Sequence, residues 1–444
     1  MKKIPEYWQW FDEARFGLFI HWGAYAAYGR GEQVLNRERL DHRQYSEAAC
    51  RWQPEHYDPA VWATVARGAG MKYAVFGARH HDGYCLWDTQ HTDYSTACQA
   101  PRRDFVREYV EAFRAAGLRV GLYYSLIDLR VPAWLDGPQK DPDGWARIKA
   151  YVFDQVRELL TNYGKLDVIW FDGLWPRSAA ELDSRALIAM IRELQPEILI
   201  NDRLEWPQYS WHWQFPDHPG VPDEIGDFGT PEQGIYAKPG YLWESCQTAN
   251  WRHWGYAHGE HWKSAVEILD LLVECANRAG NLLLNVGPQA DGRLPPQFVE
   301  RVTQIGDWLA LHGEAIYGCE RGDITEFTTH GWQTVQGNNL YLILRFYAEP
   351  AEVRTVGLES RVERATLLSN GQQLPFEQRG DELIISGLPA LPPNPLFPVI
   401  KLECSEPPRG GAWSQNRIWG TDASGFSHWA AQRGTSVWAD GKER

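Results

Sequence analysis

Short apolar runs alternate with amphipathic stretches along the first three quarters of the chain. The runs are apolar almost without interruption, which is typical of parallel strands covered by helices on both faces. Alternation of such strands with helices predicts a (β/α)8-like barrel. The expected strands are Phe16–His21, Tyr73–Ala78, Val120–Tyr124, Asp167–Phe171, Ile198–Ile200, Tyr241–Trp243 and Asn281–Val286, and the sequence does not place an eighth.

The segments between these runs carry the start and stop signals of helices. Asp58 precedes Pro59, an N-cap followed by the residue favoured at the first helical position, and Asp104 caps a second helix that ends at Gly117. A doubly wound sheet is the alternative fold, but no glycine-rich phosphate loop follows the first strand. Further helices are expected at residues 144–163, 179–195, 262–279 and 297–312.

The pattern changes near residue 320, where helical periodicity fades and short β-rich runs begin. Asn370-Gly371 is typical of a hairpin turn between two such runs. We therefore expect a catalytic barrel over residues 1–320, a small C-terminal antiparallel β-sandwich over 321–404, and an extension of unclear structure over 405–444. The expected strands of the sandwich are Asn339–Phe346, Glu352–Val356, Arg364–Leu368, Glu382–Ile385 and Pro398–Leu402.

Polar side chains follow nearly every strand of the predicted barrel. Catalytic residues of such barrels lie just past the carboxyl ends of the strands, on one face. The residues at these ends are His21 and Trp22, His80, His81 and Asp82, Tyr124 and Ser125, Asp172, Asn201, Asp202 and Arg203, Glu244, and Asn285.

Asp172 is the most informative of these residues, because it ends an apolar strand and is followed by Gly173. Burial of a carboxylate costs several kcal/mol unless it is hydrogen-bonded or paired, so chemistry is the best reason for its place. Carboxylates together with His, Tyr, Trp and Arg suit a neutral sugar, and glycoside hydrolysis needs two carboxyl groups beside the scissile bond.

The ordered set of motifs resembles the alpha-L-fucosidases of glycoside hydrolase family 29. The similarity runs from about residue 7 to about 320 and implies a retaining enzyme that releases terminal fucose. It is carried by Phe16-Gly17-Leu18-Phe19-Ile20-His21-Trp22-Gly23, His80-His81-Asp82-Gly83-Tyr84, Gly121-Leu122-Tyr123-Tyr124-Ser125, Trp170-Phe171-Asp172-Gly173, Asn201-Asp202-Arg203, Trp243-Glu244, Trp254-Gly255-Tyr256 and Asn281–Pro288.

The resemblance implies roles for individual residues. Asp172 would be the nucleophile that forms a covalent fucosyl-enzyme, and Trp170 would pack near the methyl group of the sugar. Gln33 departs from the family pattern, because Trp is usual at this position. Trp254 follows the sixth strand and suits the rim of a sugar site. The residues that match fucose-binding positions are His21, Glu32, His80, His81, Tyr124 and Arg203.

The general acid and base is the second carboxyl group that the chemistry requires. Glu232 belongs to a segment, Gly226–Glu232, that resembles the one carrying this group in several relatives. Glu244 is the rival, at the end of a predicted strand. Glu232 is preferred because a long loop between two strands would let it reach across the site.

Composition narrows the choice of partners. The net charge of −14 argues against nucleic acid or an anionic membrane as the main partner. Seven scattered cysteines without a C-x-x-C pair are typical of reduced thiols, and the N-terminus shows no signal peptide. We expect a cytoplasmic protein, although a secreted chain without its signal would look the same. The oligomeric state stays open, with a homo-oligomer as one option.

Two other functions remain as alternatives. An exo-glycosidase for a galactose-configured sugar could use the same scaffold, and a non-catalytic protein could bind fucose without hydrolysis. Two adjacent histidines, His80 and His81, raise the possibility of a metal site. Neighbours on a strand point to opposite faces, however, and the sequence has no spacing of His and Cys typical of zinc ligands. We therefore expect no metal and no cofactor.

Overall fold

The computed structural model describes residues 4–205, 226–235, 241–322, 324–325, 330–347, 352–393 and 396–410. Within these residues, eight parallel strands form one sheet in the order β5-β4-β3-β2-β1-β8-β7-β6. A parallel bridge between Asn201 and Phe228 joins the two outermost strands and closes the barrel. The strands are β1 (Phe16–Ile20), β2 (Tyr73–Arg79), β3 (Arg119–Ser125), β4 (Val168–Asp172), β5 (Leu199–Ile200), β6 (Phe228–Gly229), β7 (Leu242–Thr248) and β8 (Asn281–Val286).

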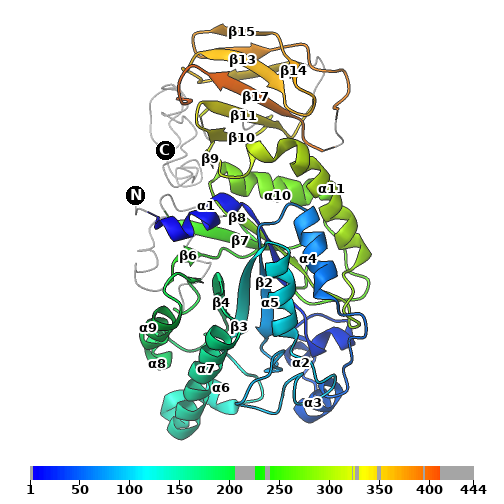
Figure 1. The fold of residues 1–444 in the computed structure, drawn as a ribbon, viewed down its shortest axis with the longest axis vertical. Coiled ribbons are helices and arrows are strands. Elements are labelled where there is room, and N and C mark those ends of the chain that lie inside the picture. Colours follow the sequence, from blue (N-terminus) through cyan, green and yellow to red (C-terminus); the bar gives the residue numbers. More distant parts are fainter. Residues whose placement is uncertain are drawn as a thin grey trace, which may run out of the picture.

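Helices surround this barrel, as Figure 1 shows for α4, α5 and α7. The predicted helix over 179–195 is divided in two by Asp183, which adopts a left-handed conformation with φ of 64°. In the described residues no helix is both long and apolar enough to cross a bilayer. The helices are α1 (Gln9–Ala14), α2 (Val34–Arg37), α3 (His42–Ala49), α4 (Pro59–Gly68), α5 (Phe105–Ala115), α6 (Pro132–Lys140), α7 (Pro142–Asn162), α8 (Ala179–Leu182), α9 (Ser184–Leu194), α10 (Ala265–Asn277) and α11 (Pro296–His312).

The strand that the sequence did not place is β6. It has only two residues, so it carries no periodic pattern that a sequence could reveal. The strand β5 is equally short. Directly after it, the side chain of Asn201 makes hydrogen bonds to β4 of the kind that backbone groups make within a sheet. The Asn201 carboxamide accepts from the Phe171 backbone N–H at 2.8 Å and donates to the Phe171 carbonyl at 2.9 Å.

Side chains of the barrel strands alternate between an inner and an outer core. On β3, Tyr123 belongs to the cluster inside the barrel, whereas Leu122 and Tyr124 pack with the surrounding helices. Phe11 of α1 lies inside the barrel, with its ring centroid 4.9 Å from that of Phe228.

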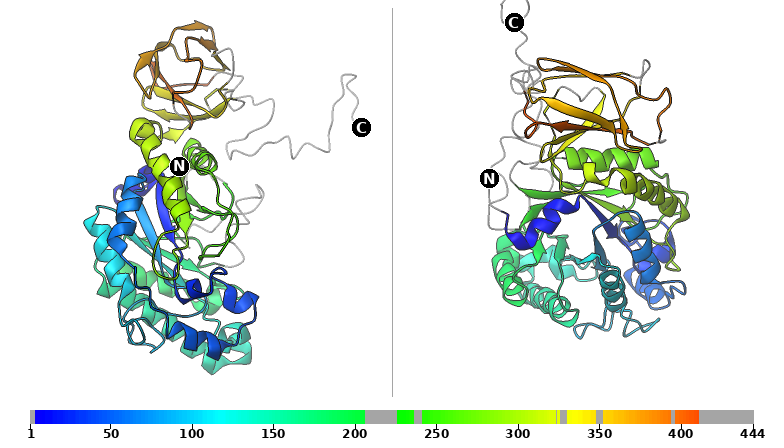
Figure 2. Two further views of the ribbon diagram at one scale, coloured as in Figure 1. Left: turned by 90° about the vertical axis from the view of Figure 1, so that its right-hand side faces the viewer. Right: turned by 45° about the horizontal axis from the view of Figure 1, so that its top comes forward.

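The C-terminal strands form two antiparallel sheets, as predicted for a β-sandwich (Figure 2). Among the described residues the six-stranded sheet has the order β14-β13-β17-β11-β10-β9, and the three-stranded sheet has the order β12-β16-β15. Of the expected extension, residues 411–444 lie outside the described part. The strands are β9 (Glu320–Arg321), β10 (Gly331–Gln336), β11 (Asn339–Leu344), β12 (Val353–Val356), β13 (Val362–Leu367), β14 (Gln372–Gln373), β15 (Phe376–Arg379), β16 (Glu382–Ile385) and β17 (Val399–Cys404).

Helices α10 and α11 lie between the barrel and the sandwich (Figure 1). The Trp332 indole of β10 donates to Asp270 of α10 at 2.8 Å, and the Trp308 indole of α11 donates to the Phe397 carbonyl at 2.7 Å. The sandwich is therefore held against α10 and α11 by hydrogen bonds as well as by apolar contacts.

Candidate active site

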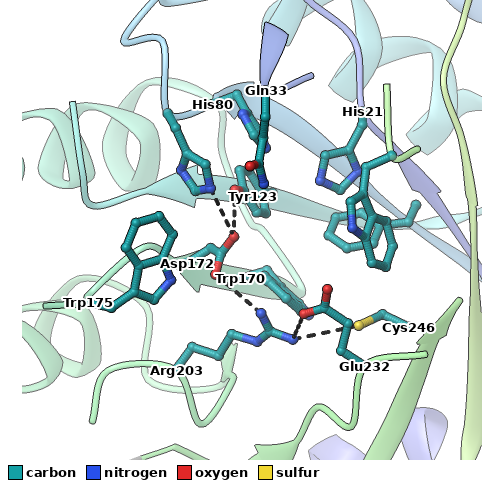
Figure 3. A pocket seen from close by; sticks show the side chains of 13 residues that line it. His21, Gln33, His80, Tyr123, Trp170, Asp172, Trp175, Arg203, Glu232 and Cys246 are labelled. Carbon is teal, nitrogen blue, oxygen red and sulfur yellow. Dashed lines mark hydrogen bonds and ion pairs between the residues drawn. The ribbon is translucent and has the colours of Figure 1, made fainter. Parts of the chain in front are cut away.

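A cavity of about 230 Å³ opens at the carboxyl ends of the barrel strands (Figure 3). It is smaller than the ~300–1,000 Å³ of sites for drug-sized ligands, so it suits one small ring. Its walls combine aromatic side chains with imidazoles, carboxylates and one guanidinium. The lining residues are Phe19, His21, Gln33, His80, His81, Tyr123, Trp170, Asp172, Trp175, Arg203, Glu232, Cys246 and Trp254.

Asp172 is the last residue of β4, and its carboxylate points into the cavity (Figure 3). One oxygen accepts from the Tyr123 hydroxyl at 2.9 Å and lies 3.6 Å from His81 Nε2. Gly173, with φ of 73°, turns the chain where a Cβ would approach Ile127 and His81. Although burial alone would raise the pKa of Asp172, the charge of Arg203 and the His81 and Tyr123 contacts lower it below its ordinary value. The carboxylate is therefore ionised at neutral pH.

Arg203 links the two carboxyl groups of the cavity. Its Nη1 lies 3.2 Å from Asp172 Oδ1, and its Nη2 lies 2.9 Å from Glu232 Oε2. The guanidinium is only 4% exposed, and its Nε donates to the Thr230 hydroxyl at 3.0 Å. Because the guanidinium is planar and its donors are fixed in direction, it holds the Asp172 and Glu232 carboxyl groups in one fixed relative position.

The two candidate acid residues occupy different places. Glu232 lines the cavity, and its side chain is 35% exposed. Glu244 was predicted at a strand end, but β7 continues to Thr248, so Glu244 lies within the strand and is fully buried. Its oxygens accept from Tyr73 Oη at 2.5 Å and from Trp170 Nε1 at 2.8 Å. Only Glu232 is placed to reach a ligand in the cavity.

Three histidines line the opposite wall. His21 Nδ1 is 2.7 Å from the Asn285 carboxamide oxygen, and His81 Nδ1 is 2.7 Å from the Ser125 hydroxyl. His80 Nδ1 is buried and has no hydrogen-bond partner among the described residues. Burial lowers the pKa of His21 to about 4 and lowers the pKa of His80 and His81 as well. Neutral imidazoles are suited to hydrogen bonds with the hydroxyl groups of a neutral sugar.

The alternation expected for His80 and His81 does not hold, because both residues lie past the end of β2. Their rings are 4.1 Å apart, and both line the cavity. Within the described ranges, no group of three His, Cys, Asp or Glu side chains is arranged to hold a metal ion.

Comparison with known proteins assigns the chain to a family. A sequence model described as alpha-L-fucosidase matches residues 2–314. The chain belongs to the alpha-L-fucosidase family. This membership confirms the predicted resemblance and, with it, the prediction of a glycoside hydrolase that cleaves fucosyl bonds.

Individual members of the family are similar to the chain over most of its length. The tissue alpha-L-fucosidase of Bos taurus is 29% identical over 413 residues, covering 87% of this chain and 86% of the relative. Alpha-L-fucosidase isoenzyme 1 from Paenibacillus thiaminolyticus is 36% identical, with a TM-score of 0.80, covering 90% of this chain and 99% of that structure. An alpha-L-fucosidase from Bacteroides thetaiotaomicron, solved as a covalent intermediate trapped with 2-fluoro-fucosyl fluoride, is 27% identical, with a TM-score of 0.81 and coverages of 91% and 97%.

The expected fucosidase contact at Tyr124 is corrected by the structure. The Tyr124 hydroxyl donates to Gln155 Oε1 at 2.9 Å, and its ring packs under the Arg79 guanidinium, outside the barrel. Tyr123 faces the cavity instead, because it is paired in register with Trp170 of β4. Two adjacent tyrosines are equally apolar, so hydropathy could not tell which one points inward; only the register of β3 with β4 does.

Glu32 also differs from its expected place in a fucosidase pocket. Its carboxylate is buried and does not line the cavity. One oxygen accepts from the backbone N–H groups of Trp254 at 3.0 Å and Gly255 at 2.9 Å. Glu32 thus holds the loop that presents Trp254, whereas its neighbour Gln33 lines the cavity.

Five residues line the fucosidase pocket but were not among those predicted for it, namely Phe19, Gln33, Tyr123, Trp175 and Cys246. Trp175 belongs to the loop after β4, and Cys246 lies on β7 with its sulfur 3.8 Å from Arg203 Nη2. Nothing in the local sequence of Trp175 or Cys246 signals a site, whereas Phe19 and Tyr123 lie within motifs that carry the family resemblance. The remaining predicted residues, His21, His80, His81, Trp170, Arg203 and Trp254, all line it.

The pair Tyr123 and Tyr124 provides a test of the corrected position. Tyr123→Phe removes a hydrogen bond to an ionised carboxylate, typically worth about 1.5–3 kcal/mol, so kcat/KM on an aryl α-L-fucoside should fall roughly tenfold to hundredfold. Tyr124→Phe should lower Tm but leave kcat/KM within about twofold. Steady-state kinetics and thermal melts check both. Equal losses of kcat/KM in the two variants would contradict the inward direction of Tyr123.

Glu244 generates a prediction about pH. Burial raises its pKa to about 7, against hydrogen bonds from Tyr73 and Trp170 that lower it, with Asp202 and Arg203 as nearby charges. The folded state favours the protonated form of Glu244, so the raised pKa contributes to the stability of the folded protein at low pH. This contribution is complete below the ordinary pKa of 4.5 and is lost as pH rises through 7. Glu244→Gln stays neutral at every pH, so its Tm relative to the parent should rise between pH 5 and pH 8. A difference in Tm that does not change with pH would disprove the raised pKa.

Proposed function

We propose that Asp172 is the nucleophile and Glu232 the general acid and base in the retaining hydrolysis of terminal α-L-fucosides. The observation that carries the proposal is the single guanidinium of Arg203, which binds both carboxyl groups inside one cavity of sugar size. Retaining hydrolysis requires a pair of carboxyl groups on the two sides of the scissile bond.

The first half of the reaction forms a covalent intermediate. An oxygen of Asp172 attacks the anomeric carbon of the sugar, and the bond from this carbon to the leaving oxygen breaks. Protonated Glu232 transfers its proton to the leaving oxygen, so the aglycone departs as a neutral alcohol. The lowered pKa of Asp172 keeps the nucleophile ionised during this step.

The second half reverses the roles with water. Glu232, now ionised, takes a proton from a water molecule as the water attacks the anomeric carbon. The ester bond to Asp172 breaks, fucose leaves with its original configuration, and both carboxyl groups return to their starting states. Arg203 and the Tyr123 hydroxyl stabilise the returning carboxylate.

The other walls of the cavity support a deoxy sugar as the ligand. The imidazoles of His21, His80 and His81 face its hydroxyl groups, while the aromatic rings of Trp170 and Trp254 offer apolar surface to its methyl group. A cavity for one ring favours a terminal residue of a fucosylated oligosaccharide or glycoconjugate over an internal one. Cytoplasmic localisation and assembly into a homo-oligomer stay predictions.

Trapping of the intermediate tests the nucleophile. Incubation with 2-fluoro-fucosyl fluoride should inactivate the enzyme and add one fluorofucosyl group to the peptide that contains Asp172. Asp172→Asn should lose turnover by a factor of at least about 10⁴ and remain unlabelled, with a normal far-UV spectrum and cooperative melt. A label on another carboxylate would overturn the assignment.

A higher kcat/KM on an aryl β-galactoside than on the α-L-fucoside would favour the galactose-specific alternative, and sugar binding without turnover would favour a lectin-like protein.

The dependence on the leaving group tests the acid. Glu232→Gln should slow hydrolysis of an alkyl α-L-fucoside by about 10²–10⁴, since the poor leaving group needs the proton. Fucosyl fluoride needs less help, so this variant should still show a rapid burst of fluoride as the intermediate accumulates. Glu244→Gln is the matched control and should affect both substrates alike. A leaving-group effect confined to Glu244→Gln would reverse the two roles.

A further inference from the structure

Glu244 is a fully buried carboxyl group that the proposed reaction does not use. It lies on β7 inside the barrel, beneath the cavity. Each of its oxygens has one neutral donor, Tyr73 Oη at 2.5 Å and Trp170 Nε1 at 2.8 Å. A buried carboxyl group held by neutral donors is a costly way to stabilise a core, and apolar residues of similar volume often serve as well. Its place therefore suggests a role beyond stability.

Trp170 connects Glu244 to the reacting groups. The Trp170 ring lines the cavity, and the Arg203 guanidinium lies 4.5 Å from its centroid. On the same wall the Tyr123 ring is stacked with Trp170 at a centroid distance of 5.6 Å and an interplanar angle of 26°. Two of the groups that touch the Asp172 carboxylate, Arg203 and Tyr123 (Figure 3), thus both pack on the ring whose indole nitrogen donates to Glu244.

We propose that Glu244 is a positioning residue of the reaction. Its carboxyl oxygen fixes the plane and depth of the Trp170 indole, and that ring sets where Arg203 and Tyr123 hold Asp172 and Glu232. The inference rests on the proposed function of these two carboxyl groups. It assigns Glu244 no contact with substrate and no proton transfer to it.

Two substitutions at Glu244 separate positioning from simple packing. Glu244→Leu has similar volume but no acceptor, so the indole N–H of Trp170 is left unsatisfied and the ring can shift. Glu244→Gln keeps one acceptor oxygen for Trp170, while Tyr73 can accept from the new amide. Because small displacements of reacting groups reduce rates by up to about hundredfold, kcat on an aryl α-L-fucoside should fall about 10–100-fold in Glu244→Leu and no more than about threefold in Glu244→Gln.

A double-mutant cycle with Trp170→Phe gives a readout that packing alone would not produce. Phe lacks the indole N–H, so the link to Glu244 is already broken in this variant. If Glu244 acts through Trp170, the double variant Trp170→Phe with Glu244→Leu should have the same kcat as Trp170→Phe alone. Tyr73→Phe is the matched control: it removes the other hydrogen bond to the same carboxyl group and should lower Tm while leaving kcat within about twofold.

The outcomes distinguish this inference from the proposed function. Multiplicative losses of kcat in the double variant would overturn the positioning role, and so would a fall in Tm with unchanged kcat in Glu244→Leu. In either case, an active parent that is labelled at Asp172 upholds the proposed function. An inactive parent, or a label elsewhere, would overturn the function first. Should Glu244→Leu fail to fold, Glu244→Gln and Glu244→Met measured in the two Trp170 backgrounds complete the same cycle.

Discussion

The ion pairs of Arg203 with two carboxyl groups are the interaction on which the site depends. A guanidinium that is 4% exposed gains little from water, and it requires anionic partners to be stable where it lies. Asp172 provides one throughout the proposed reaction and Glu232 a second whenever it is ionised, and in return the fixed charge lowers the pKa of Asp172 against the effect of burial. The same contact therefore stabilises the pocket, ionises the proposed nucleophile and sets its direction relative to the proposed acid.

Arg203 can reach both groups because of the two shortest strands of the barrel. The Asn201 carboxamide takes the place of missing backbone partners beside Phe171, and its bridge to Phe228 closes the ring of strands. These contacts bring residues 201–205, which follow β5, against the ends of β4 and β6. The barrel is closed where regular pairing is weakest, and it is there that Asp172, Arg203 and Glu232 meet.

One wall of the cavity is neutral and the other is charged. Burial keeps His21, His80 and His81 neutral by lowering their pKa values, so the sugar side of the cavity presents hydrogen-bonding groups without added charge. Charge is concentrated at Asp172, Arg203 and Glu232, where the transition state of the proposed reaction develops positive charge at the anomeric carbon. This division allows a neutral ligand to bind while the charged groups act mainly on the transition state.

The sequence by itself determined the barrel, the sandwich, the family and the place of Asp172 at the end of a buried strand, because apolar runs, turn signals and ordered motifs are local properties of a chain. Only the tertiary structure decided that Tyr123 and not Tyr124 faces the cavity, that Glu32 supports a loop, and that Glu244 is buried inside the barrel below the cavity. The outcomes for Tyr123 and Glu244 depend on strand register and strand length, and the outcome for Glu32 depends on a contact between two loops far apart in sequence. Register is set by pairing between segments far apart in sequence, and a shift of one residue exchanges the two faces of a strand.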